Sequence, residues 1–365
     1  MKLSSSVIYV FLFLMACVTP YEINTTFRKQ LVVEGLITDQ PGPYQVKISR
    51  TVPIQDQLYA TDWVVGASVV VEDDQGNSET LVEMSPGNYY TKTFQGVVGR
   101  SYRVNIATND GSVYQSSAEK LLPVGDFSNL RYEFVQNEEA KFLYEQIHTT
   151  NGFNIYLDSD VLPEQSGRVW WRWTGTYEIY TYPQFHMKVI PFGLVADPLP
   201  CSGYIVRNKV LMQTGECTCC YCWVTQYNQV PVISDPKFIN ENKINNLNVA
   251  FIESNVRTFY NKYYLEVEQL SVSQAVYDFW KVIQIQRQNS SNLFQTPSPK
   301  TQSNITTTSP NALPAIGYFA ASSVKKHSIM IERKDVPYPV WPIDTLATSC
   351  TQAYKNSTTK KPSFW

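Results

Sequence analysis

The sequence lacks a surplus of positive charge. Its 365 residues carry 30 Lys and Arg against 32 Asp and Glu, which gives a net charge of −2. A nucleic-acid-binding protein needs a basic patch or stripe to neutralise phosphates, so we expect no nucleic-acid partner. The apolar share of 43% excludes an intrinsically disordered chain. At about 150 residues per domain, the length predicts two domains.

The sequence also lacks the motifs that mark common catalytic and cofactor sites. It has no G-x-S-x-G, H-E-x-x-H, P-loop or G-x-G-x-x-G pattern. The three histidines, His148, His186 and His327, have no histidine neighbour at metal-ligand spacing. Two pairs of nearby acids are typical of a solvated surface: Glu138 with Glu139, and Asp158 with Asp160. We therefore predict no catalytic residue, no metal and no cofactor, in a protein that is not an enzyme.

No apolar run is long enough to cross a membrane, because the run at Val7–Ala16 has only ten residues. With Lys2 before it, this run is typical of a signal-peptide core. It ends in Leu14-Met15-Ala16-Cys17, which resembles a bacterial lipobox, where the Cys receives a diacylglycerol. We therefore predict a lipoprotein signal peptide at 1–16, a lipidated Cys17 and a tether at 17–30. An ordinary secretory signal is the alternative.

The predicted acyl chains would anchor the protein stably, since each buried CH₂ contributes about 0.8 kcal/mol. The residue after Cys17 is Val18 rather than Asp, which favours the outer membrane over retention in the inner membrane. We therefore expect an outer-membrane, lipid-anchored protein, and the leaflet stays open.

Beyond Cys17, six cysteines remain: Cys201, Cys217, Cys219, Cys220, Cys222 and Cys350. An even number in an exported chain predicts three disulfides. Adjacent Cys219 and Cys220 are unsuited to bond each other, so at least one bridge should tie the cluster to Cys201 or Cys350. The bridges would staple a loop at 198–223. A metal site is the alternative, but four thiols within six residues are too tight for a zinc tetrahedron.

Short strands with turns between them dominate residues 31–122. The Val69–Val71 run is β-branched, and Tyr102, Val104 and Ile106 alternate along a strand. Asp73–Asn77 and Asn109–Gly111 are typical of hairpin turns. This pattern predicts an immunoglobulin-like β-sandwich at 31–122, with a domain junction at 124–126.

Residues 127–365 predict a larger β-rich C-terminal domain with one amphipathic helix. Strands are expected at 154–158, 168–182, 257–270, 317–322 and 328–332. A helix is expected at 271–289, with Ser271 as its N-cap and an apolar stripe packed on the second sheet. The stripe consists of Val272, Val276, Phe279, Trp280 and Ile283.

Trp170, Trp171 and Trp173 lie in one predicted strand, which places Trp171 and Trp173 on one face and Trp170 on the other. Flat indoles could form an aromatic binding platform for sugars. The favoured interpretation is structural, with one face in the core and the other beneath the cysteine loop.

Several C-terminal segments, together with Cys17, resemble a domain-of-unknown-function family of Bacteroidota outer-membrane lipoproteins. In chain order they are Ser273–Ala275, Tyr277–Trp280, Leu293–Pro297, Asn304-Ile305 and Gly317–Val324. Members of this family are often encoded next to TonB-dependent receptors. The resemblance implies a TonB-dependent β-barrel as partner, supports the disulfides and carries over no catalytic residue.

The sequence and the resemblance together favour a non-catalytic binding or accessory subunit of a TonB-dependent transporter, acting in nutrient uptake by substrate capture or as a lid. Two alternatives stay open. A surface polysaccharide or peptide hydrolase would need a cleft with two carboxylates. A structural or adhesive envelope protein would affect adhesion without affecting uptake.

Overall fold

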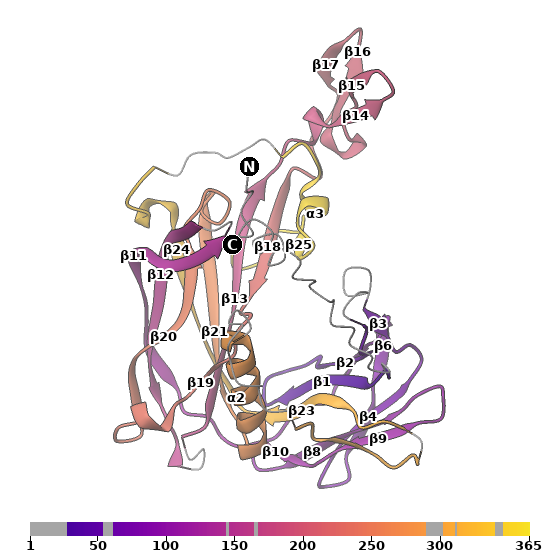
Figure 1. Cartoon of the computed structure of the whole chain (residues 1–365), viewed down its shortest axis with the longest axis vertical. Coiled ribbons are helices and arrows are strands. Elements are labelled where there is room, and N and C mark those ends of the chain that lie inside the picture. Colours follow the sequence, from indigo (N-terminus) through magenta and orange to yellow (C-terminus); the bar gives the residue numbers. More distant parts are fainter. Residues whose placement is uncertain are drawn as a thin grey trace, which may run out of the picture.

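The computed structural model describes residues 28–53, 61–143, 146–163, 167–289, 302–310, 312–339 and 346–365. The predicted signal peptide, Cys17 and nearly all of the tether lie outside these residues. The fold is mainly β, as the sequence predicted, and consists of a sandwich, a larger β unit and helix α2 between them (Figure 1).

The first unit is a β-sandwich of two sheets, which confirms the sandwich prediction. One sheet has the order β23-β1-β2-β7-β6, with β3 on β2, and the other has the order β22-β9-β8-β4-β5, with β10 on β8. The strands from the N-terminal part of the chain are β1 (Leu31–Thr38), β2 (Gln45–Arg50), β3 (Asp62–Trp63), β4 (Ser68–Asp73), β5 (Ser78–Thr80), β6 (Val82–Ser85), β7 (Asn88–Tyr90), β8 (Ser101–Ala107), β9 (Val113–Ser116) and β10 (Glu119–Lys120).

Period-two alternation accounts for how these strands pack. In β8, Tyr102, Val104 and Ile106 are buried, and the residues between them are partly exposed. Both predicted hairpins form, because β4 pairs antiparallel with β5 and β8 pairs antiparallel with β9. The local turn signals therefore set the order of these strands.

Two strands from much later in the chain complete the sandwich. These are β22 (Ile305–Thr307), which pairs with β9, and β23 (Ile316–Ser322), which runs parallel to β1. Ile305 and Phe319 join the same buried core as the N-terminal strands. The sandwich is therefore larger than residues 31–122, because burying these apolar strands completes its core.

Gly317 allows β23 to lie close to β1. Its φ is +100°, and a Cβ there would lie 2.0 Å from the Val33 carbonyl oxygen. We expect Gly317→Ala to lower the free energy of unfolding by about 3 kcal/mol, from backbone strain plus this clash. Urea unfolding of the two proteins measures the difference.

Gly76→Ala is the matched control, because Gly76 has a φ of +85° and open space around its Cβ position. It carries the backbone strain without the clash, so its cost should be about 1 kcal/mol. Equal costs for the two variants would show that the approach to Val33 is unimportant.

The second unit packs a three-stranded sheet against a larger one. The first has the order β11-β12-β20, and the second has the order β24-β21-β13-β18-β25, with β19 on β13. Their strands are β11 (Phe127–Leu143), β12 (Gln146–Asp160), β13 (Val169–Tyr180), β18 (Tyr221–Tyr227), β19 (Val232–Ile233), β20 (Lys243–Glu253), β21 (Lys262–Ser271), β24 (Val324–Glu332) and β25 (Ser357–Thr358).

A single core lies between these two sheets. Phe153 and Ile155 come from β12, and Trp171, Leu265 and Val267 come from the larger sheet; all are fully buried or nearly so. Residues Arg333–Asp335 form a 3-10 turn after β24, and α3 (Cys350–Ala353) is a short helix beside β18.

The predicted amphipathic helix is α2 (Gln274–Asn289), and its start differs from the expectation. Ser271 is the last residue of β21, paired with Val169, so it cannot cap the helix. Ser273 does so instead, because its Oγ accepts from the Val276 N–H at 3.2 Å. Val276 and Phe279 of the expected stripe are buried against the second unit and β23.

Buried hydrogen bonds join the two units beside α2. The Ser271 hydroxyl donates to the Leu122 carbonyl oxygen at 2.5 Å and accepts from the Ser323 N–H at 3.0 Å. The buried Glu119 carboxylate of β10 accepts from the Tyr318 hydroxyl and the Ser273 hydroxyl, each at 2.7 Å. The junction is therefore fixed by polar contacts as well as by apolar packing.

Two further hairpins project from the second unit at the end of the molecule opposite the sandwich (Figure 1). They are β14 (Met187–Ile190) with β15 (Gly193–Ala196), and β16 (Tyr204–Arg207) with β17 (Val210–Gln213). With the 3-10 turns at Pro183–Phe185 and Pro200–Ser202, they form a segment that we call the arm, residues 183–217.

Candidate ligand-binding cleft

A cleft of about 350 Å³ lies where the sandwich, the second unit and α2 meet. Its volume is in the range of small-molecule sites, which often lie between domains. One wall comes from β1, β2 and β23 of the sandwich, and the other from β13, β21 and β24, with Trp280 of α2 beside them.

Three charged side chains form a row across the second wall. Strand register places Arg172 of β13 opposite Glu268 of β21, and Glu268 opposite Lys326 of β24. Glu268 accepts from the Arg172 Nε–H, and its other oxygen lies 2.5 Å from the Lys326 Nζ. The Glu268 side chain is only 12% exposed, so this carboxylate depends on both cations.

The aromatic part of the cleft is a stacked pair of indoles. The rings of Trp170 and Trp280 lie 4.7 Å apart between centroids, with 27° between their planes. The Arg172 guanidinium carbon lies 5.8 Å from the Trp170 ring centroid, within cation–π range. Within the part of the chain that the structure describes, the buried Trp170 Nε1 has no hydrogen-bond acceptor.

The contacts within the charged row shift the pKa values of Glu268 and Lys326. Burial by itself raises the pKa of Glu268, but the Arg172 charge and the hydrogen bonds from Lys326 and Arg172 outweigh it and hold that pKa below its usual value. Burial lowers the pKa of Lys326, and the hydrogen bond and charge of Glu268 reverse this and raise it. Glu268 and Lys326 are therefore both charged at neutral pH.

The lowered pKa of Glu268 predicts a pH-dependent contribution to stability. The ionised carboxylate stabilises the fold above the unfolded-state pKa of about 4.3, and this contribution is lost as the pH falls through the folded-state pKa. Glu268→Gln should therefore cost about 1–2 kcal/mol at about pH 7 and much less in acid. Urea unfolding across pH measures both quantities.

Glu266→Gln is the control, since Glu266 is 33% exposed and lies 3.6 Å from the same Lys326 Nζ. Its cost should stay below about 0.5 kcal/mol. A cost for Glu268→Gln that stays constant from neutral to acid pH would contradict the interpretation.

The predicted aromatic platform is divided between two environments. Trp171 and Trp173 are buried in the core of the second unit, and Trp170 lies on the opposite face of β13. The assignment to opposite faces is therefore confirmed. Trp170 packs against α2 at the cleft, however, and not beneath the cysteine segment.

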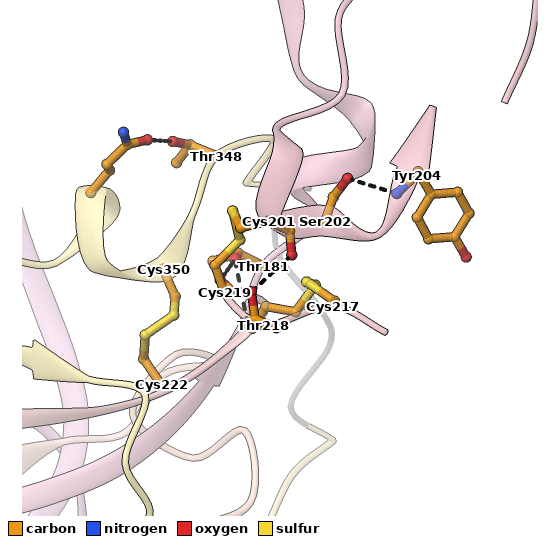
Figure 2. Close-up of a disulfide and its surroundings, with 12 residues drawn as sticks. Thr181, Cys201, Ser202, Tyr204, Cys217, Thr218, Cys219, Cys222, Thr348 and Cys350 are labelled. Atoms are coloured by element: carbon orange, nitrogen blue, oxygen red, sulfur yellow. Dashed lines mark hydrogen bonds between the residues drawn. A yellow bond between two sulfur atoms is a disulfide. The ribbon is translucent and has the colours of Figure 1, made fainter. Parts of the chain in front are cut away.

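The six cysteines form three disulfides, Cys201–Cys219, Cys217–Cys220 and Cys222–Cys350. Adjacent Cys219 and Cys220 bond to different partners, as expected. Figure 2 shows Cys201–Cys219 at the base of the arm and Cys222–Cys350 between β18 and α3. The Cα atoms of each pair lie 5.6–5.8 Å apart, which is ordinary for a disulfide.

The other residues considered from the sequence lie apart from the cleft. Asp158 of β12 accepts hydrogen bonds from Asn129 of β11 and Asn246 of β20, and the His327 Nε2 lies 2.9 Å from Asp126 Oδ1. The side chains of His148, Glu138 and Glu139 are outside the described part. In the described residues, no group of three or more His, Cys, Asp or Glu is placed to hold a metal ion.

Four cleft residues were not predicted as site residues from the sequence: Arg172, Glu268, Trp280 and Lys326. Trp280 was expected only in the apolar stripe of the helix. Alternation along β13 already puts Arg172 on the same face as Trp170. The pairing of three strands that are far apart in the sequence brings the other charges to it. Local patterning carries no signal for such pairing.

The fold and the cleft define a mainly β protein whose two packed units flank an open cleft of small-molecule size. The model of the domain of unknown function DUF4249 matches residues 18–328, and the chain belongs to this family. Among the curated proteins, none matches the chain. The family membership confirms the domain-of-unknown-function part of the resemblance; its bacterial group, lipid anchor and receptor context stay predictions. Among the described helices, none combines the length and the apolar character needed to span a bilayer.

Proposed function

We propose that this protein is a non-catalytic binding lipoprotein of the outer membrane that captures a substrate for a TonB-dependent transporter. The observation that carries the proposal is the cleft between the units, where the stacked indoles of Trp170 and Trp280 lie beside a charged row. Such a combination of apolar surface and a few directed polar groups is typical of ligand sites.

The charge pattern favours a neutral ligand. Arg172 and Lys326 contact Glu268, and Lys47 lies 3.7 Å from Glu34, so each cation lining the cleft has a carboxylate partner. An anionic ligand would have to displace one of these carboxylates. A neutral, hydroxyl-rich ligand can instead pack a sugar ring against the partly exposed Trp280 indole at the cleft. We therefore propose a neutral oligosaccharide.

The proposed location in the outer membrane and the proposed partner rest on features of the sequence. The lipobox at Cys17 supports a lipid anchor, and the family resemblance supports a TonB-dependent β-barrel as partner. In this role the protein would hold the ligand close to the transporter entrance, raising its local concentration there.

Thermal unfolding with neutral oligosaccharides tests the ligand class. Malto-, xylo- and β-gluco-oligosaccharides are added separately to the purified protein. A ligand at 100 times its Kd should stabilise the fold by about 2.7 kcal/mol, which raises the Tm. Trp280→Ala should abolish this rise, whereas Trp63→Ala, outside the cleft and 38% exposed, should retain it.

Two outcomes would count against this function. A rise in Tm that survives Trp280→Ala would place the ligand elsewhere, and no rise with any of the sugars would reject the ligand class. Release of reducing sugar ends during the incubation would favour the hydrolase alternative.

The partner is tested by purifying the protein from outer membranes in a mild detergent. A TonB-dependent β-barrel should co-purify with it. Recovery of the protein with no barrel would contradict the accessory role, whatever the result of the sugar experiment.

A further inference from the structure

The arm carries an unusual amount of exposed apolar surface. Phe192 is 98% exposed, Val189 78% and Leu194 62%, values that a water-soluble surface rarely shows for neighbouring large side chains. Ten exposed large apolar side chains belong to the arm: Phe185, Met187, Val189, Phe192, Leu194, Val195, Ile205, Val206, Val210 and Met212.

The first hairpin of the arm is apolar on both of its faces. Residues 189–196 read Val-Ile-Pro-Phe-Gly-Leu-Val-Ala, with no polar side chain among eight positions. A strand that contacts a partner on one face alternates apolar and polar residues, as β8 does in the sandwich. A hairpin without alternation fits an apolar medium that surrounds it on both faces.

The base of the arm is cross-linked to the second unit, which holds the hairpins in place while their apolar surface stays exposed. Two disulfides tie it to the residues just before β18: Cys201–Cys219, which Figure 2 shows, and Cys217–Cys220. Backbone hydrogen bonds add to them, from the Leu199 N–H to the Pro183 carbonyl oxygen at 3.1 Å and from the Thr214 N–H to the Gly203 carbonyl oxygen at 2.7 Å.

The charges of the two hairpins have one sign. Lys188, Arg207 and Lys209 are all exposed, and residues 187–196 and 204–213 contain no Asp or Glu. The acids of the arm, Asp197 and Glu216, lie outside both hairpins. Apolar side chains beside exposed cations suit the boundary between acyl chains and anionic headgroups.

We propose that the arm inserts the tip around Phe192 into the surface of an anionic phospholipid bilayer, with Arg207 and Lys209 at the headgroup phosphates. The arm is thus a second membrane contact, at the end of the molecule opposite the sandwich (Figure 1). It does not depend on acylation of Cys17 or on a ligand in the cleft. The absence of alternation favours lipid over a protein partner, which would cover one face of the hairpin.

Flotation of the chain from Val18 onward, which contains every described residue and no acylated Cys, tests the proposal. The vesicles contain phosphatidylethanolamine with phosphatidylglycerol, and a second set contains phosphatidylcholine alone. The protein should float with the first set and bind the second more weakly. Salt at about 1 M should weaken binding to the anionic vesicles, because it screens the cations.

Variants locate the contact. Phe192→Asp should weaken vesicle binding at least about tenfold, the loss expected when one buried Phe is removed from the apolar phase. Phe238→Asp is the matched control, because Phe238 is 72% exposed but lies outside the arm. Arg207→Glu with Lys209→Glu should remove the preference for anionic vesicles, whereas Lys360→Glu with Lys361→Glu, also exposed, should not.

Phe192→Asp should keep the Tm of the parent protein, since the side chain it replaces makes almost no buried contact. The proposal is overturned if the parent protein does not float, or if Phe192→Asp floats like the parent protein. It is equally overturned if the arm variants bind vesicles normally but no longer co-purify a β-barrel, since the arm would then dock on protein.

Discussion

Replacing Cys222 and Cys350 together by Ala is expected to lower the free energy of unfolding by about 5 kcal/mol. The bridge closes a loop between residues 128 positions apart, and the loss of unfolded-state entropy grows with loop length. Both side chains are fully buried, and the bond fixes the C-terminal segment against β18, where β25 also pairs. Urea unfolding of the oxidised parent protein and of the variant measures the difference.

The Cys217–Cys220 pair is the matched control, because it closes a loop of only three positions. Replacing both by Ala should cost about 2 kcal/mol by the same entropic argument. A reductant should bring the parent protein to the stability of a variant that lacks all three bridges. Equal costs for the two double variants would mean that loop length does not control the effect.

Trp171→Ala is expected to cost about 4–5 kcal/mol, the second-largest effect. Trp171 is one of the largest fully buried side chains in the described residues, and its removal leaves a cavity in the core of the second unit. The substitution also leaves a buried acceptor without its hydrogen bond, because the Trp171 Nε1–H donates to Gln269 Oε1 at 2.7 Å. The Gln269 amide in turn donates to the Gly125 carbonyl oxygen at 2.7 Å, at the junction between the units.

Two further variants separate these contributions. Trp171→Phe keeps most of the apolar volume and loses the hydrogen bond, so it should cost about 1–3 kcal/mol. Trp63→Ala removes an indole that is 38% exposed and should cost less than either. If Trp171→Phe cost as much as Trp171→Ala, the polar network rather than the packing would dominate.

Sequence patterns that act over a few residues predicted the local structure well. Alternation and turn residues placed the hairpins β4–β5 and β8–β9, and the apolar stripe placed α2. The start of α2 was wrong by a few residues because β21 continues through Ser271 in register with Val169. Strand pairing therefore decided a boundary that capping preference had placed at Ser271.

Local sequence patterns predicted much less of the candidate site. Trp170 was singled out from the sequence, but as one of three neighbouring indoles, and two of these are core residues. Arg172 is on the same strand as Trp170, but its other partners at the cleft, Glu268, Trp280 and Lys326, lie about 100 residues or more further along the chain. No spacing within one segment indicates such neighbours.

The sequence by itself determined the mainly β character, the positions of several strands, the long helix α2 and the assignment of Trp170 and Trp171 to opposite faces. These properties follow from side-chain periodicity and turn chemistry, which act between near neighbours. Only the tertiary structure decided that β23 completes the N-terminal sandwich, which cysteines bond, and how the cleft is lined. These depend on burial between segments far apart in the chain, where the free energy comes from packing that no local pattern encodes.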